Sequence, residues 1–95
     1  MDLIITGYVS GTFGVDGYLK VASSSGEYDH FFELEKVYIV FSKRKLLNSK
    51  YKNGWFDVEA VKLIPSCTLL KLEGIETVEE AKSFVGAELR VSRGN

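Results

Sequence analysis

The chain has 95 residues, of which 45% are apolar, 13% aromatic and 26% charged. These values exclude a disordered, collagenous or low-complexity chain. The length provides for a single core, which excludes a large cofactor-dependent enzyme with a cleft between two lobes. The formal net charge of −1 gives no whole-molecule attraction to nucleic acid or to an anionic membrane, so any such attraction must come from a local patch.

Three further features indicate where the chain resides. Cys67 is the single cysteine, which excludes an intramolecular disulfide. The N-terminal residues lack the basic region and long apolar region of a signal peptide. No apolar run approaches the ~20 residues that a membrane-spanning helix needs. We therefore expect a soluble, cytoplasmic protein.

Most apolar residues fall in short segments in which apolar and polar positions alternate. This period of two, with turn residues between the segments, predicts half-buried antiparallel strands. The predicted strands are 3–9, 18–22, 37–41, 55–64, 67–73 and 88–91. In the first of them we expect Leu3, Ile5 and Val9 to share a face, and in the fourth Phe56, Val58 and Ala60.

One short helix is predicted near the C-terminal end. Thr77, followed three residues later by Glu80, forms a capping box, in which the hydroxyl and the carboxylate satisfy backbone amides at the helix start. An apolar stripe follows, and Gly86 is suited to end the helix in a left-handed conformation. A helix of about two turns cannot stand alone and must pack on the sheet. The expected fold is therefore all-β, a small six-stranded antiparallel barrel with one short helix.

A glycine-rich segment between the first two strands carries Gly7, Gly11, Gly14 and Gly17. Such a segment is a candidate phosphate cradle, but a P-loop requires Gly-Lys-Ser/Thr, which is absent here. A dinucleotide site requires a helix after the glycines, whereas the residues from Tyr18 onward indicate a strand. The preferred interpretation is a turn whose glycines have a structural role.

A basic segment follows the third predicted strand. It combines five cations with an aromatic residue, and no acidic residue lies between Glu35 and Asp57. Such clusters bind phosphate backbones, and aromatic side chains add base stacking. The candidate RNA- or ribosome-binding residues are Lys43, Arg44, Lys45, Lys50, Lys52 and Trp55. The alternative, that this segment is a solvated hairpin tip, stays open.

No group of residues supports catalysis. His30 has no set of metal ligands around it, and Cys67 with a single histidine in the chain makes a weak nucleophile. Asp57 and Glu59 lie two residues apart on one predicted strand face, but nothing marks a cleft around them. We predict no catalytic residue, no metal and no cofactor.

Segments along nearly the whole chain together resemble one known family. The segments are the four glycines followed by Leu19-Lys20-Val21, the turn Tyr28-Asp29-His30-Phe31-Phe32-Glu33-Leu34, and the closing unit Leu69-Leu70-Lys71-Leu72-Glu73-Gly74-Ile75, Glu79-Glu80-Ala81-Lys82 and Gly86-Ala87-Glu88-Leu89-Arg90-Val91. In this order they resemble the N-terminal domain of RimM, a family of bacterial ribosome maturation factors.

The resemblance implies a translation-protein-like barrel over residues 1–95, without the C-terminal PRC-type barrel of full-length members. It implies a non-enzymatic assembly factor for the small (30S) ribosomal subunit that assists assembly of the head region and maturation of the 16S ribosomal RNA. The implied partners are the head-region RNA of the immature subunit and a head ribosomal protein, the latter through the absent barrel. No membrane or small-molecule substrate is implied, and we expect a monomer.

Four positions in the glycine segment depart from the family pattern. Family members often carry Arg, His, Arg and Glu where this chain has Tyr8, Phe13, Asp16 and Tyr18. The segment therefore lacks the groups best suited to contact RNA, which moves the expected contact to the basic segment from Lys43 to Lys52. The alternative function is a small barrel that binds RNA or protein outside ribosome assembly, because fold alone does not decide function.

Overall fold

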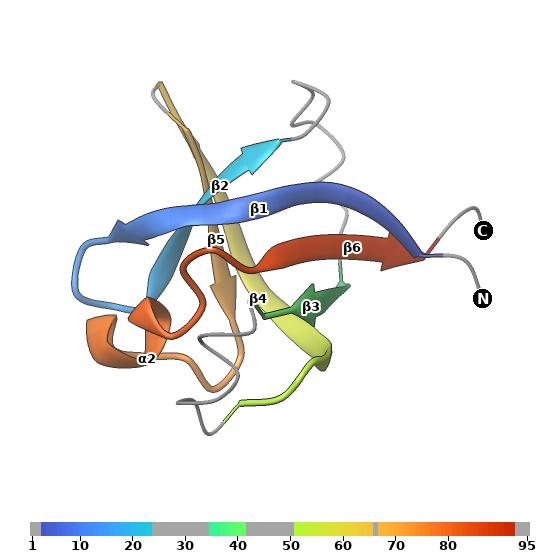
Figure 1. Cartoon of the computed structure of the whole chain (residues 1–95). Coiled ribbons are helices and arrows are strands. Elements are labelled where there is room, and N and C mark those ends of the chain that lie inside the picture. Colours follow the sequence, from blue (N-terminus) through green and yellow to red (C-terminus); the bar gives the residue numbers. More distant parts are fainter. Residues whose placement is uncertain (1–2, 24–34, 42–50, 66, 93–95) are drawn as a thin grey trace.

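The computed structural model describes residues 3–23, 35–41, 51–65 and 67–92. Within these ranges the chain forms six strands and one short helix (Figure 1). The elements are β1 (Leu3–Phe13), β2 (Tyr18–Ser23), β3 (Lys36–Val40), β4 (Gly54–Ile64), β5 (Cys67–Leu72), α2 (Val78–Lys82) and β6 (Glu88–Ser92). No helix in these ranges has the length and apolarity that a membrane crossing requires.

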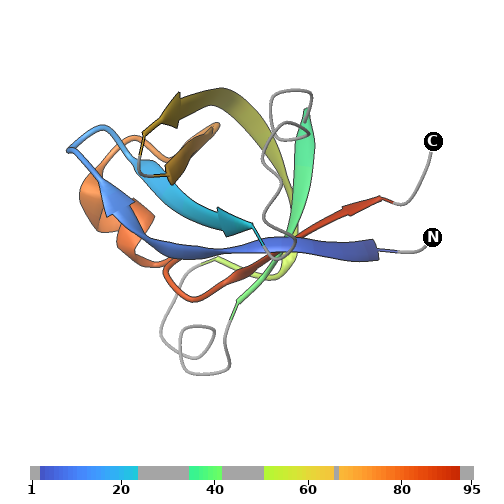
Figure 2. The same cartoon turned by 90° about the horizontal axis from the view of Figure 1, so that it is seen from above.

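The six strands close into one antiparallel barrel, which confirms the predicted fold class. The strands follow one another around the barrel in the order β1-β2-β5-β4-β3-β6, and β6 pairs with β1 to complete the ring. Figure 2 shows the strands curving around a common interior. A closed ring pairs the strand edges with one another, which removes the open edges on which other chains could add.

Two predicted strand faces are wrong in part because β-bulges interrupt the alternation. The register of β1 against β6 shifts between Ile5 and Gly7, so Ile5 is 46% exposed while Val9 is buried. The register of β4 against β5 shifts between Val58 and Ala60, so these two residues do not share a face. An extra residue at a bulge moves the following side chains to the other face of the sheet.

The barrel interior is filled by the inward residues of all six strands. Leu19 and Val21 on β2 and Val37 and Ile39 on β3 are at most 1% exposed, as the alternation predicts. The remaining buried apolar residues that form this core are Val9, Phe41, Leu70, Leu72, Ile75, Ala81, Phe84, Ala87 and Leu89. This apolar burial is the main source of the fold's stability.

An aromatic cluster closes the barrel beside the helix. The ring centroid of Phe84 lies 5.1 Å from that of Phe41, 5.0 Å from that of Tyr51 and 5.4 Å from that of Phe56. These separations fall in the range at which tilted and edge-to-face aromatic pairs attract one another. The cluster joins the chain after α2 to the segments that flank the connection between β3 and β4.

The helix begins as predicted and ends earlier than predicted. The Thr77 hydroxyl oxygen accepts a hydrogen bond from the Glu80 amide at 3.2 Å, and the Glu80 carboxylate accepts one from the Glu76 amide at 3.0 Å. The helix ends at Lys82, four residues before Gly86, which has a positive φ of 91° in the following turn. Of the two boundary signals in the sequence, only the capping box at the helix start therefore marked a boundary correctly.

Candidate functional site

The glycine-rich segment divides between a strand and a turn. Gly7 and Gly11 lie within β1, while Gly14 and Gly17 lie in the turn that leads to β2 and have positive φ values of 69° and 94°. The predicted turn is therefore confined to the second half of the segment. Strand β2 begins directly at Tyr18, so the glycines are followed by a strand rather than by the helix that a dinucleotide site requires.

Two of these glycines are required by close backbone approach. A Cβ on Gly7 would lie 2.5 Å from the carbonyl oxygen of Ala22 on the paired strand. A Cβ on Gly17 would overlap the carbonyl oxygen of Ile75, in the connection that leads to α2. Gly7 and Gly17 therefore allow close packing of the backbone.

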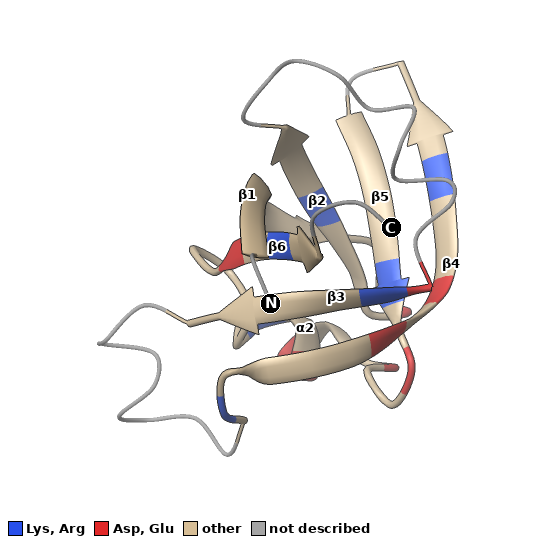
Figure 3. Cartoon of the chain, turned by 90° about the vertical axis from the view of Figure 1, so that its right-hand side faces the viewer, with Lys and Arg blue, Asp and Glu red and all other residues tan. Residues whose placement is uncertain are grey.

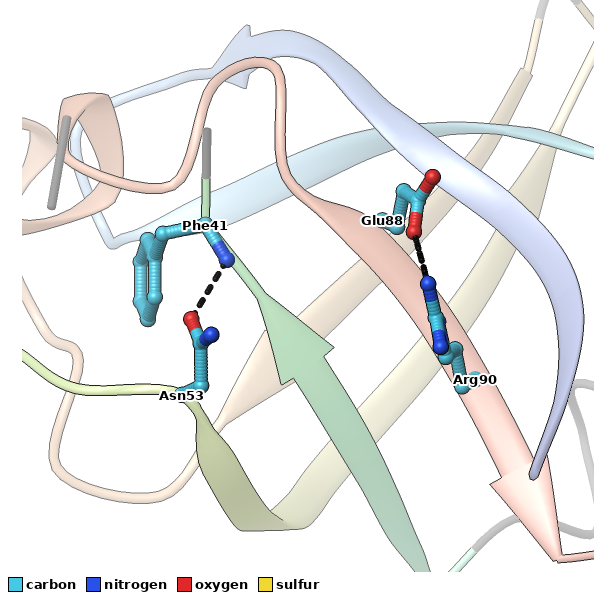
Figure 4. Close-up of polar contacts among 4 residues, drawn as sticks. All are labelled: Phe41, Asn53, Glu88 and Arg90. Atoms are coloured by element: carbon cyan, nitrogen blue, oxygen red, sulfur yellow. Dashed lines mark hydrogen bonds and ion pairs between the residues drawn. The ribbon is translucent and has the colours of Figure 1, made fainter. Parts of the chain in front are cut away.

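Most of the basic segment, namely Lys43, Arg44, Lys45 and Lys50, lies outside the described residues, as does His30. Lys52 and Trp55 are described, and both are exposed. The backbone amide of Phe41 donates a 2.8 Å hydrogen bond to Oδ1 of Asn53, between Lys52 and Trp55 in the chain (Figure 4). This bond ties the end of β3 to the start of β4, and Lys52 and Trp55 therefore lie near that junction.

Trp55 belongs to a row of outward residues across four strands. In register, Trp55 on β4 lies opposite Tyr38 on β3, and Tyr38 lies opposite Arg90 on β6. Arg90 in turn lies opposite Ile5 on β1. The Tyr38 and Trp55 rings meet edge to face with centroids 5.4 Å apart.

The charge in this row is partly neutralised. The Arg90 guanidinium group lies 2.6 Å from the carboxylate of Glu88, two residues earlier on β6 (Figure 4). Trp55 and Ile5, at the two ends of the row, are 44% and 46% exposed. We call Ile5, Tyr38, Trp55 and Arg90 the aromatic row. The sequence reasoning identified only Trp55, because the partners in this row are set by strand register.

The two carboxylates considered for catalysis do not form a pair. Asp57 lies opposite Lys36 in the register of β3 and β4. The Glu59 carboxylate lies 3.5 Å from the Lys71 ammonium group, and Glu59 occupies the bulge position of β4. Among the described residues, no group of three or more His, Cys, Asp or Glu residues is arranged to hold a metal ion. Cys67 is half-buried at the start of β5.

The described part of the chain thus defines a small closed antiparallel barrel whose outer surface, rather than a cleft, carries the candidate binding residues. The family model described as "RimM N-terminal domain" matches residues 4–95. The chain therefore belongs to the RimM N-terminal domain family, as the sequence resemblance indicated.

Two relatives illustrate the similarity. The chain is 46% identical over 93 residues to the ribosome maturation factor RimM of Treponema denticola, covering 98% of this chain and 52% of that protein. It is 40% identical over 93 residues to the ribosome maturation factor RimM of Treponema pallidum, covering 94% of this chain and 53% of that protein. The chain spans about half the length of the curated relatives it matches.

Two solved structures share the fold. The crystal structure of the RimM protein of Pseudomonas aeruginosa, named as a 16S ribosomal RNA processing protein, matches with a TM-score of 0.77 at 22% identity, over 97% of this chain and 51% of that one. The solution structure of the N-terminal domain of RimM from Thermus thermophilus matches with a TM-score of 0.72 at 18% identity, over 97% and 91% of the two chains.

Proposed function

We propose that this chain acts in ribosome maturation as a non-enzymatic assembly factor for the small ribosomal subunit. The observation that carries the proposal is the match of residues 4–95 to the RimM family, whose relatives are named ribosome maturation factors. The rRNA-processing name of the Pseudomonas aeruginosa protein supports the small subunit as the target. This role places the protein in the cytoplasm, where ribosomes assemble.

The proposed mechanism is a shift of population rather than a chemical reaction. A factor that binds one arrangement of an immature particle more tightly than the alternatives raises the share of that arrangement. The target we propose is the head-region RNA, so that binding assists head assembly and 16S RNA maturation. Contact with a head ribosomal protein is assigned, as the family resemblance implies, to a C-terminal PRC-type barrel.

The proposed RNA contact uses the end of the barrel at which β3 leads to β4. In this proposal the basic segment from Lys43 to Lys52, which follows β3 in the sequence, supplies the cations, and the exposed ring of Trp55 offers a stacking surface. The edge-to-face contact with Tyr38 restricts the Trp55 ring, which lowers the entropy lost on binding. The chain acts as a monomer in this proposal.

The test is co-sedimentation with ribosomal particles in a density gradient. The chain is assayed alone and joined to the C-terminal half of the Treponema denticola relative, with immature small subunits and with large subunits. We expect enrichment on immature small subunits for at least the joined protein. Replacing Lys43, Arg44, Lys45, Lys50 and Lys52 with Ser is expected to reduce that enrichment.

A different result would contradict the proposal. If neither protein is enriched on small subunits, the role in assembly is wrong. If the chain binds free RNA but no ribosomal particle, the barrel is an RNA-binding module outside ribosome assembly. Equal enrichment on large subunits would show attraction to ribosomal RNA in general rather than a role specific to the small subunit.

A further inference from the structure

A second cationic surface lies on the part of the barrel formed by β2, β5 and β4. Figure 3 shows Lys positions, in blue, on each of these three strands. They are Lys20 on β2, Lys71 on β5 and Lys62 on β4. These lysines come from sequence positions far apart, and none belongs to the basic segment from Lys43 to Lys52.

The strand register places the lysines around one apolar residue. Leu69 on β5 lies opposite Lys20 on one side and opposite Lys62 on the other. Its neighbours along β5, Thr68 and Leu70, are buried on the inner face, so alternation directs Leu69 outward. Leu69 is nevertheless 2% exposed.

Tyr18 brings two of the ammonium groups together. The Lys62 Nζ lies 4.9 Å and the Lys71 Nζ 5.9 Å from the centre of the Tyr18 ring. Both distances lie within the range of cation–π attraction. Among the described residues, the Glu59 carboxylate contacts the Lys71 ammonium group at 3.5 Å, and no ion pair is formed by Lys20 or Lys62 within that part of the chain. Two like charges gathered on one ring repel each other, and a bound anion would relieve that repulsion.

An exposed aromatic ring borders the lysines. Phe13 on β1 lies opposite Tyr18 in register and is 43% exposed. Beside it, Gly11 lies opposite Lys20, and the Lys20 stem passes at ordinary contact distance, with its Cδ 3.8 Å from the position that a Cβ would occupy. Phosphate-binding ammonium groups next to an exposed ring are the combination with which proteins bind single-stranded nucleic acid.

We propose that Phe13, Tyr18, Lys20, Lys62 and Lys71, here named the lysine face, bind single-stranded RNA. Lys20 and Lys62 contact phosphates, Phe13 stacks on a base, and Tyr18 positions the ammonium groups of Lys62 and Lys71, the latter also paired with Glu59. The three strands that carry the lysines are each ~5 Å from the next, so the backbone positions of the lysines span about 10 Å across the sheet, while Tyr18 draws two of their ammonium groups together. An acidic protein segment would use the charge but not the exposed ring, and RNA uses both.

The lysine face and the aromatic row are separate contacts on one barrel. Trp55 and Lys62 lie on the same strand, β4, seven residues apart, which is about 20 Å along an extended strand. The inference deepens the proposed function, on which it rests for the identity of the RNA. It adds a contact surface whose residues are not neighbours in the sequence and were therefore not indicated by the basic segment.

The test is a titration of a fluorescein-labelled oligouridine of about 12 nucleotides with the 95-residue chain at several salt concentrations. We expect Lys20→Gln with Lys62→Gln to reduce the slope of log K against log salt by about 1.4, since each single-strand phosphate contact contributes about 0.7. We expect Phe13→Ala to weaken binding about tenfold with the slope unchanged.

The matched control is Lys36→Gln with Lys82→Gln, which removes the same charge from exposed positions on β3 and α2. It is expected to leave the slope nearly unchanged. An equal reduction of slope in the control would show that net charge alone matters and would overturn the proposal. An unchanged slope in the Lys20 and Lys62 variant would overturn it as well. Thermal unfolding monitored by circular dichroism verifies that each variant is folded.

A competition experiment separates RNA from an acidic protein partner. We expect polyglutamate, added at the same concentration of charge as the oligouridine, to displace the RNA poorly. Displacement as efficient as that by unlabelled oligouridine would assign the face to acidic protein and overturn the proposal. The titration contains no ribosomal particle, so its outcome is independent of the co-sedimentation. A lysine face that does not bind RNA would leave the proposed role in assembly intact, and a failed co-sedimentation would leave RNA binding by the lysine face intact.

Discussion

The Tyr51 side chain is hydrogen-bonded to the carboxylate of Glu80, and this bond joins the segment before β4 to helix α2. The Tyr51 ring also lies 5.0 Å from the ring of Phe84, beyond the helix. Burial, followed by the negative charge of Glu80 and the hydrogen bond to it, raises the pKa of Tyr51 above its usual value of 10.0. The same Glu80 carboxylate accepts from the Glu76 amide at the helix start.

This arrangement predicts a loss of stability at high pH. Because the folded protein favours the protonated phenol of Tyr51, the contribution of that group is fully present below the unfolded pKa near 10 and is lost as pH rises through the higher folded pKa. The Tyr51→Phe variant has no phenol to ionise and so lacks this loss. The difference in the free energy of unfolding between the variant and the unmodified chain should therefore shrink above pH 10. Urea denaturation at neutral pH and above pH 10 measures the difference. A stability difference that stays constant with pH would contradict the interaction assigned to Tyr51 and Glu80. The control is Tyr38→Phe, on the outer face.

Replacing Thr68 with valine should stabilise the fold. Its hydroxyl oxygen is fully buried without a hydrogen-bond partner among the described residues. Burying an unpaired hydroxyl is unfavourable, and valine keeps the shape of the side chain without it. Thr68→Val is therefore expected to raise the free energy of unfolding by about 1 kcal/mol. Thr68→Ser, which keeps the hydroxyl and removes a methyl group, is expected to lower it by about 1 kcal/mol. A less stable valine variant would show that the hydroxyl is satisfied.

Gly14 and Gly17 allow backbone strain and steric overlap to be separated. Both have positive φ values, but the space around a Cβ at Gly14 is open, whereas a Cβ at Gly17 would overlap the Ile75 carbonyl. Gly14→Ala is expected to cost about 1 kcal/mol from the left-handed conformation alone. Gly17→Ala carries the same strain and the overlap, and is expected to cost about 3 kcal/mol. Denaturant unfolding compares them, and equal costs would be inconsistent with the close approach at Ile75.

Trp55 should contribute to RNA binding and little to stability. Its ring is 44% exposed and contacts Tyr38 on the outer surface. Trp55→Ala is expected to weaken binding to a single-stranded RNA about tenfold through loss of base stacking, with the salt slope unchanged. Leu63→Ala, at a 55% exposed position on the same strand, is the control. Equal affinities for the two variants would remove Trp55 from the binding surface.

The fold was predictable where alternation is unbroken. The inward residues Leu19 and Val21 on β2, and Val37 and Ile39 on β3, follow from a period of two alone. The predicted inward position of Ile5 is wrong because a β-bulge shifts the register there. A bulge is a property of two paired strands, and the sequence of one strand does not locate it. The helix start was predictable from Thr77 because capping is a local interaction.

The candidate surfaces were predictable only where their residues are neighbours in the chain. The basic segment is visible as a run of cations, but Lys20, Lys62 and Lys71 are scattered and meet through the register of β2, β5 and β4. The aromatic row is likewise assembled across four strands, and Trp55 was identified while Arg90 was not. Strand pairing between distant segments is the information that composition and local spacing lack.

Ultraviolet cross-linking of the chain to immature small subunits tests the central claim most directly. The account predicts cross-links to head-region RNA of the small subunit, with fewer cross-links when Phe13 or Trp55 is replaced by alanine. Cross-links spread evenly over all cellular RNA, or an unchanged pattern in both variants, would contradict the claim that this barrel binds ribosomal precursors through its outer surface.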